Sequence, residues 1–145
     1  MQLQMRYKTW GGKRKYAGRK PGQSKPGVVH SKRPSTNGRH PLHVTLKVGR
    51  QIPNLRTQVP MRALRDAFAA GKCRAGFRLI HFSVQPDHVH MVIEADDRAS
   101  LSRGVQGLSI RIARGINRAI GRAGRVFADR YHARALGTPR EVRMR

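Results

Sequence analysis

Two histidines separated by a single residue are the clearest candidates for chemistry in this sequence. His88 and His90 lie in the run HVHMVIE, where Val89, Met91 and Ile93 occupy alternate positions. Successive side chains of a strand point to opposite faces, so both histidines should leave the same polar face, close enough to share one ion. Two imidazoles suit Mn or Zn, and further oxygen ligands from a phosphate and water would admit Mg. The pattern therefore predicts a partial metal site.

The neighbouring residues favour a functional site over two ordinary surface histidines. Polar side chains expected on the same face could supply an oxygen ligand or support a ligand ring; they are His81, Ser83, Gln85 and Glu94. A metal ion beside many arginines would suit phosphodiester chemistry, in which the ion polarises the scissile phosphate. The nucleophile would be water or one of the three tyrosines. Tyr131 lies on the predicted last strand, where it is either the nucleophile or an aromatic that packs against the sheet.

The charge of the chain points to a polyanionic partner. Lys and Arg number 31 against 7 Asp and Glu, which gives a formal net charge of +24. Such a charge repels itself unless a polyanion neutralises it, so nucleic acid is the first candidate partner and membrane lipid the second. No apolar run approaches the ~18 residues that cross a bilayer, and the N-terminus lacks the apolar stretch of a secretory signal. We expect no membrane segment and a cytoplasmic, nucleoid-associated location.

Residues 1–41 are predicted to form a flexible, disordered basic arm. They are rich in Gly, Pro, Ser and Lys and have few apolar side chains, so they cannot bury enough surface to offset the entropy of ordering. Within the arm, Arg19 and Lys20 lie between Gly18 and Pro21 and resemble the cationic arms that enter the minor groove of DNA. The alternative is a solubilising tail.

Residues 42–145 are predicted to form one α+β domain. Alternating apolar residues predict a strand at 43–48, two strands joined by a Pro-Asp turn at 77–94, and a last extended segment at 126–136. Pro60 and Gly71 should bound a first helix, and Ser100 should cap a longer second one. The order is βαββαβ. A ferredoxin-like antiparallel sheet with both helices on one face is the economical way to bury it.

The second helix is expected to carry DNA-binding arginines. Its apolar positions recur at spacings of three and four, and arginines line another side. Such residues would bind phosphates. The arginines assigned to this role are Arg103, Arg111, Arg114, Arg118 and Arg122.

The run HFSVQPDHVHMVIEADD, the following LSRGVQGLSIRIARGINRAIGRAGRVFADRYHARAL and the final TPREVR together resemble the single-tyrosine HUH transposases, within them the REP-associated tyrosine transposases. The HUH element maps onto His88, Val89 and His90. The resemblance implies a protein that binds hairpin-containing or single-stranded DNA, often as a homodimer. Its two histidines hold Mg or Mn on the scissile phosphate while a tyrosine attacks and forms a 5′-phosphotyrosine link.

One feature departs from the pattern of this family. The family's tyrosine lies on the helix after the last strand, which here begins with a capping box at Thr138 and Glu141 and contains no tyrosine up to Arg145. Tyr131 precedes that helix and does not match the family's position. We expect a domain truncated in this helix, which binds DNA and metal but lacks the tyrosine-dependent cleavage step.

A basic ribosomal or RNA-binding protein without catalysis is the alternative function. The short length, the basic arm and a small α+β domain all fit binding to ribosomal RNA. This alternative gives no reason for His88 and His90 to share a strand face. A DNA affinity that depends on metal would separate the two hypotheses.

Overall fold

The structure is a computed structural model that describes residue 36 and residues 38–143. The greater part of the predicted arm, including Arg19 and Lys20, lies outside the described residues. So do Tyr7 and Tyr16, which leaves Tyr131 as the tyrosine to be considered among the described residues.

The domain is a five-stranded antiparallel sheet with two helices on one face. The strand order is β2-β3-β4-β1-β5, and each neighbouring pair is antiparallel. Without the short β2, this is the strand order of a ferredoxin-like βαββαβ domain, so the predicted fold is confirmed. The elements are β1 (Leu42–Lys47), α1 (Gln58–Gly71), β2 (Cys73–Arg74), β3 (Phe77–Val84), β4 (His88–Ala95), α2 (Arg98–Ala119), β5 (His132–Ala135) and α3 (Pro139–Arg143).

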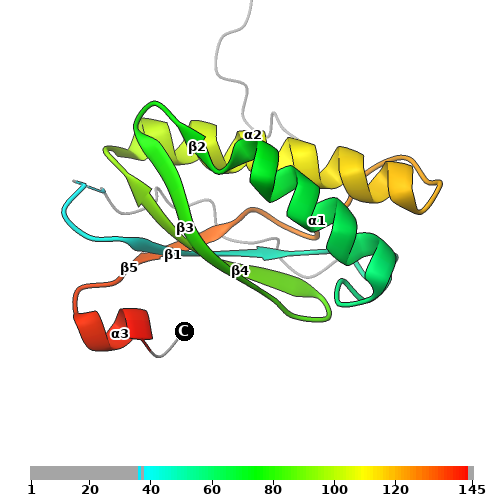
Figure 1. Cartoon of the computed structure of the whole chain (residues 1–145), viewed down its shortest axis with the longest axis horizontal. Helices are drawn as coiled ribbons and strands as arrows, with labels where there is room; N and C mark the ends of the chain where they lie inside the picture. The colour runs from blue at the N-terminus through cyan, green and yellow to red at the C-terminus, as the bar shows by residue number, and fades with distance from the viewer. Residues whose placement is uncertain (1–35, 37, 144–145) are drawn as a thin grey trace, which may run out of the picture. The chain divides into compact units, whose positions relative to one another are not determined.

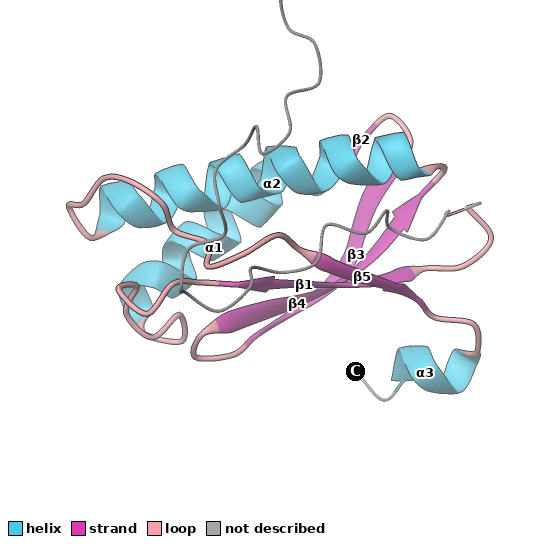
Figure 2. Cartoon of the chain, turned by 180° about the vertical axis from the view of Figure 1, so that it is seen from behind, coloured by secondary structure: helices cyan, strands magenta, loops and turns pink. Residues whose placement is uncertain are grey.

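The two faces of the sheet have different surroundings. Helices α1 and α2 lie together on one side, and the short α3 lies on the other (Figure 1). The view from behind shows the same division, with α2 above the strands and α3 below them (Figure 2). We call the side away from α1 and α2 the open face. None of the helices in the described part of the chain is long and apolar enough to cross a membrane.

The core lies between the sheet and the two long helices. Alternate residues of β1 and β4 are buried there, among them Val44, Val89 and Met91, each with 0% of its surface exposed. Helix α2 contributes one apolar stripe, which packs against them because its members recur every three or four residues. The stripe is Leu101, Val105, Leu108, Ile112 and Ile116.

Strand β3 differs from the sequence prediction in its first half. Leu79 pairs with Ile93 of β4 and His81 pairs with Val92, so the register shifts by one residue at Ile80. This irregularity turns Leu79 toward the core and leaves Ile80 48% exposed. The prediction that Ile80 lies on the apolar face was therefore wrong. Beyond the shift, Ser83 keeps its predicted place on the open face.

Both long helices begin slightly before the predicted positions. Helix α1 begins at Gln58, and Pro60 is accommodated in its first turn, where backbone N–H groups have no partner within the helix. Helix α2 is capped by Asp97, whose Oδ1 accepts a hydrogen bond of 2.6 Å from the backbone N–H of Ser100. This hydrogen bond lowers the pKa of Asp97 below its ordinary value. Ser100 is therefore inside the helix and not its cap.

Of two local predictions about the strands, the turn is confirmed and the length of the last strand is wrong. The turn at Pro86 and Asp87 forms, closed by a 2.8 Å hydrogen bond from the backbone N–H of Gln85 to the carbonyl of His88. The last extended segment is shorter than expected, because its ladder covers only His132–Ala135 of β5, apart from a single bridge between Val48 and Phe127. The hairpin turn thus places His88 at the first position of β4.

Candidate metal centre and nucleic-acid interface

His88 and His90 lie side by side on the open face of β4. The residues that alternate with them, Val89 and Met91, are buried under the helices, so the two imidazoles point to the opposite side. The ring centroids are 4.6 Å apart and the ring planes are perpendicular. The structure therefore brings together the two residues that the sequence singled out, while their role as metal ligands stays a prediction.

Asp87 fixes the ring of His88. The Nδ1 atom of His88 lies 2.7 Å from Oδ1 of Asp87. An ionised carboxylate only accepts hydrogen bonds, so Nδ1 is the donor and Nε2 carries the lone pair of the neutral ring. This hydrogen bond lowers the pKa of Asp87, and Lys47, with its Nζ atom 3.6 Å from Oδ2, lowers it further. The carboxylate therefore stays ionised and holds the imidazole in one orientation.

His90 is held from the neighbouring strand β1. Its Nδ1 atom lies 3.0 Å from Nε2 of His43 and 3.2 Å from Oγ1 of Thr45. The rings of His43 and His90 are nearly parallel, 20° apart, with centroids separated by 4.9 Å. Sequence reasoning missed His43 as part of the site. Its alternation with Val44 places it on the open face, but only the pairing of β1 with β4 puts it beside His90.

The other polar neighbours predicted from the sequence take different places. Ser83 is the register partner of His90. His81 lies on the same face, two residues before Ser83. Glu94 forms an ion pair with Arg78, with 2.6 Å between Nη2 and Oε2, and is therefore engaged away from the histidine pair. Among residues 38–143, no group of three or more His, Cys, Asp or Glu side chains is placed to hold a metal ion.

The donor set fits an ion that is held only partly by protein. Two imidazoles, each with its Nδ1 atom hydrogen-bonded to a neighbour, present the arrangement found around metal-binding histidines. Such a pair would leave the other coordination positions to a phosphate and to water, the oxygen ligands that Mg and Mn prefer. His88 and His90 are the residues that would hold it.

Tyr131 is not part of this arrangement. The next residue, His132, pairs with Thr45 and so shares the open face, which turns Tyr131 toward the helices. Its hydroxyl lies 3.1 Å from Oγ of Ser102 on α2, and its ring packs against the core. The structure therefore places Tyr131 on the opposite side of the sheet from His88 and His90.

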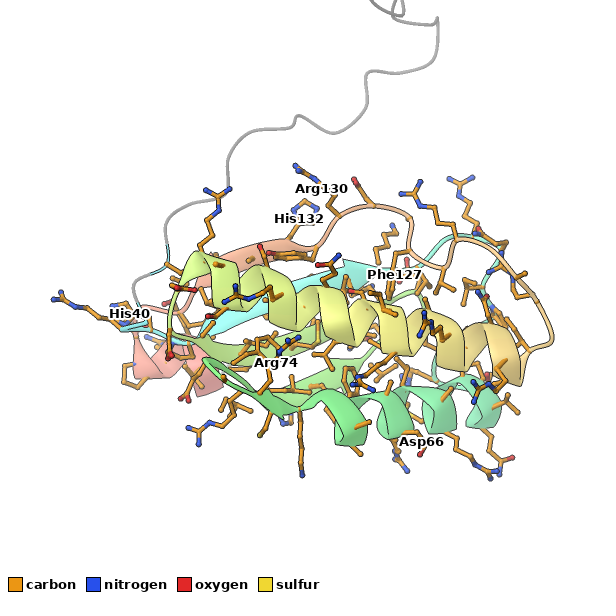
Figure 3. The ribbon with its side chains drawn as sticks, turned by 90° about the horizontal axis from the view of Figure 1, so that it is seen from above. His40, Asp66, Arg74, Phe127, Arg130 and His132 are labelled. Atoms are coloured by element: carbon orange, nitrogen blue, oxygen red, sulfur yellow. The ribbon has the colours of Figure 1, made fainter. Side chains whose placement is uncertain are left out.

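The predicted arginines of α2 also lie on the helical side. Arg111, Arg114 and Arg118 line a groove of about 660 Å³ between α1 and α2, together with Arg62 of α1. Asp66 is the one acidic residue in its lining. Figure 3 looks onto this side, with α1 and α2 next to each other and Asp66 on α1. We call this the arginine groove.

The remaining two arginines of the prediction lie outside the arginine groove. Arg103 is exposed on the first half of α2, and its carbonyl accepts a hydrogen bond from Nη1 of Arg74. Helix α2 ends at Ala119, so Arg122 belongs to the following turn, where its Nη1 donates to Oδ1 of Asn117 at 3.1 Å. The predicted row of arginines along one helix side therefore does not extend to Arg122.

Comparison with known proteins places the chain among transposases. Residues 40–144 match the family described as transposase IS200 like. The match covers more than half of the sequence, so the chain belongs to that family, and the resemblance found in the sequence is confirmed.

Solved structures with the same fold include two that are described as transposases. A REP-associated tyrosine transposase bound to a REP hairpin is 18% identical, with a TM-score of 0.61 over 81% of this chain and 67% of its own. A protein from Deinococcus radiodurans R1, assigned as a transposase, is 17% identical, with a TM-score of 0.55 over 83% and 92% of the two chains. A search of curated proteins found no match.

Proposed function

We propose that this transposase-family chain binds single-stranded or hairpin-forming DNA and holds one of its phosphates at His88 and His90 for metal-assisted strand cleavage and transfer. The observation that carries the proposal is the histidine pair itself, with rings 4.6 Å apart and a hydrogen-bonded neighbour on each Nδ1 atom. The similar transposase that was solved with a REP hairpin supports DNA as the partner.

Three residues at the site have distinct tasks in this proposal. His88 and His90 would bind the divalent ion. Asp87 orients the ring of His88 through its 2.7 Å hydrogen bond. A divalent ion, Mg or Mn, would polarise the phosphate and offset negative charge that develops during cleavage. Sheet pairing fixes the positions of these side chains before DNA arrives, and such preorganisation is what electrostatic catalysis requires.

Tyr131 is assigned a structural task and not that of nucleophile. Its hydroxyl faces Ser102 of α2, whereas the histidine pair occupies the other face of the sheet. A tyrosine attack requires the phenol oxygen within bonding reach of the phosphorus, and the sheet separates the two. Strand transfer through tyrosine therefore needs a different residue.

The arginine groove is proposed to bind DNA phosphates away from the cleavage site. Arg111, Arg114 and Arg118 concentrate positive charge between α1 and α2, with only Asp66 to oppose it. Because the groove lies over the helices and the histidines lie on the open face, the two surfaces contact different parts of the DNA. Such contacts give affinity that depends strongly on salt.

Mn²⁺-dependent binding of hairpin DNA tests the proposal. We expect the affinity of the wild type for a labelled hairpin with a single-stranded flank to rise on addition of Mn²⁺, and this rise to disappear in His88→Ala and His90→Ala. His81→Ala is the matched control, because His81 is exposed on the same face and pairs with Val92, not with His88 or His90. An affinity for the DNA hairpin that changes neither with Mn²⁺ nor with either substitution would favour the RNA-binding alternative.

A second assay addresses the nucleophile. The protein is incubated with 5′- or 3′-labelled hairpin DNA and Mn²⁺, then run on a denaturing gel, where a phosphotyrosine link appears as a protein-sized band. We expect Tyr131→Phe to leave the outcome unchanged, whether or not the wild type forms an adduct. An adduct that is present in the wild type and lost in Tyr131→Phe would overturn the structural task assigned to Tyr131.

Two broader properties complete the proposal. We propose that the chain forms a homodimer, as its resemblance to the single-tyrosine HUH transposases implies. We also propose that it works in the cytoplasm on nucleoid DNA, since its net charge of +24 favours a polyanionic partner. Light scattering on the purified chain tests the homodimer. A monomer at all concentrations up to those used for the DNA assays would remove the homodimer from the proposal.

A further inference from the structure

We propose that His43 is a positioning residue for the metal site, which accepts a hydrogen bond from Nδ1 of His90 and so fixes the ring form in which His90 can bind metal. The inference rests on the proposed function of the histidine pair. It starts from the 3.0 Å separation between Nε2 of His43 and Nδ1 of His90.

The direction of this hydrogen bond decides what His90 can do. A neutral imidazole carries one hydrogen, so the ring nitrogen without it is the one that binds metal. If His90 donates through Nδ1, its Nε2 atom carries the lone pair. If His43 donates instead, the hydrogen of His90 lies on Nε2 and blocks it as a ligand.

For His88, the position of the ring hydrogen follows from its hydrogen-bond partner. Asp87 accepts from Nδ1 of His88, because a carboxylate has no hydrogen to give. With their rings 4.6 Å apart, the two histidines can serve one ion if each presents a nitrogen that carries no hydrogen, and on both rings Nδ1 already lies against a neighbouring side chain. His43 therefore does for His90 with a neutral ring what Asp87 does for His88 with a charged group.

Burial makes His43 hard to replace by water. The residue is 9% exposed and lies on β1, which is flanked by β4 and β5. Thr45 also contacts Nδ1 of His90, at 3.2 Å, and its hydroxyl oxygen can accept from the same N–H group. The nearly parallel stacking of the two rings, 20° apart, further limits rotation of His90.

Two measurements on the full chain test the inference. The first reads the ring forms directly, from long-range ¹⁵N–¹H NMR spectra of the metal-free wild type. We expect the hydrogen of His90 on Nδ1 and that of His43 on its own Nδ1. A spectrum with the hydrogen of His90 on Nε2 would overturn the proposal, and this measurement needs no variant to fold.

The second measurement is the affinity for Mn²⁺ alone, from the electron paramagnetic resonance signal of the free ion. Loss of a residue that orients a metal ligand typically weakens binding by about 10- to 100-fold, which we expect for His43→Leu. His43→Gln restores an acceptor and should recover affinity close to that of the wild type. His81→Leu is the matched control and should change nothing.

The outcomes separate this inference from the proposed function. Wild-type protein that binds no Mn²⁺ would remove the metal site, and the NMR spectrum would still decide the hydrogen bond. Tight Mn²⁺ binding that is lost in His88→Ala but unchanged in His43→Leu would keep the metal site and overturn the positioning role of His43.

Discussion

The face of the sheet on which Tyr131 lies determines which groups its hydroxyl can reach. Its residue type matches the chemistry expected of a transposase, but alternation along the chain turns its hydroxyl to Ser102, 3.1 Å away. The sequence could not decide this, because the start of β5 relative to β1 depends on pairing between residues more than 80 positions apart. His88 and His90 were predictable, since their shared face follows from local alternation alone.

We expect Tyr131→Phe and Ser102→Ala each to lower the free energy of unfolding by about 1 kcal/mol, the net contribution of one hydrogen bond. Because the two hydroxyls contact each other, the double variant should lose little more than either single variant. Urea denaturation followed by circular dichroism measures all four proteins. Fully additive losses would show that the two hydroxyls do not interact in solution.

At the scale of elements, the succession of strands and helices was predictable and the details of their ends were not. The periods of two and 3.6 residues predicted the order βαββαβ, and the turn at Pro86 and Asp87 is present as expected. The register at Ile80 is displaced by one residue, and the cap at Asp97 lies three residues before the predicted Ser100; periodicity resolves neither difference. The short β2 has only two residues and carries no pattern.

Substitution by alanine should have opposite effects on the stability of the domain at Gly104 and at Gly115, two glycines of α2. A Cβ atom on Gly104 would overlap the ring of Phe77, so α2 and β3 must separate. We expect Gly104→Ala to destabilise the domain by about 1–3 kcal/mol, as overpacking does. A Cβ atom on Gly115 would have its nearest neighbour, the carbonyl oxygen of Ala63, at 3.5 Å, which is an ordinary van der Waals contact.

Gly115→Ala is therefore the matched comparison, and we expect it to stabilise the domain by up to about 1 kcal/mol through helix propensity. Thermal unfolding of both variants beside the wild type gives the two signs. Equal effects of the two substitutions would show that α2 does not approach β3 as closely as the structure has it.

Helix α3 should lose its N-terminal cap in acid. The carboxylate of Glu141 accepts from the backbone N–H groups of Gly137 and Thr138, at 2.8 and 3.1 Å, and from Arg134 at 3.1 Å. The hydrogen bond from Thr138 is the largest cause of a pKa of Glu141 below its ordinary 4.5, followed by those from Gly137 and the charge of Arg134.

A lowered pKa means that this stabilisation is fully present above the ordinary value and is lost as the pH falls through the lowered one. Amide chemical shifts of Gly137 and Thr138, followed by NMR between neutral pH and pH 2, should therefore titrate below 4.5. In Glu141→Gln the same amides should not titrate in this range. A midpoint at or above 4.5 in the wild type would contradict the cap.

At the scale of the whole molecule, the sheet separates the two surfaces for which we propose a function. The histidine pair occupies the open face, and the arginine groove lies between α1 and α2 on the other. The sequence identified both sets of residues, but it could not place them on opposite sides, because that depends on which side of α2 meets the sheet. Effects of substitutions on the two surfaces should add, since they share no partner.

Salt and metal should therefore act on separate parts of DNA binding. We expect Arg111→Ala to reduce the slope of log affinity against log salt by roughly 0.7 for a single strand or 0.9 for a duplex, while the response to Mn²⁺ remains. Arg65→Ala removes the same charge from α1 outside the groove lining and should leave the slope unchanged. His88→Ala should abolish the response to Mn²⁺ and keep the slope. Fluorescence anisotropy across a salt series, with and without Mn²⁺, measures both quantities, and a double variant with non-additive losses would show that one DNA segment contacts both surfaces.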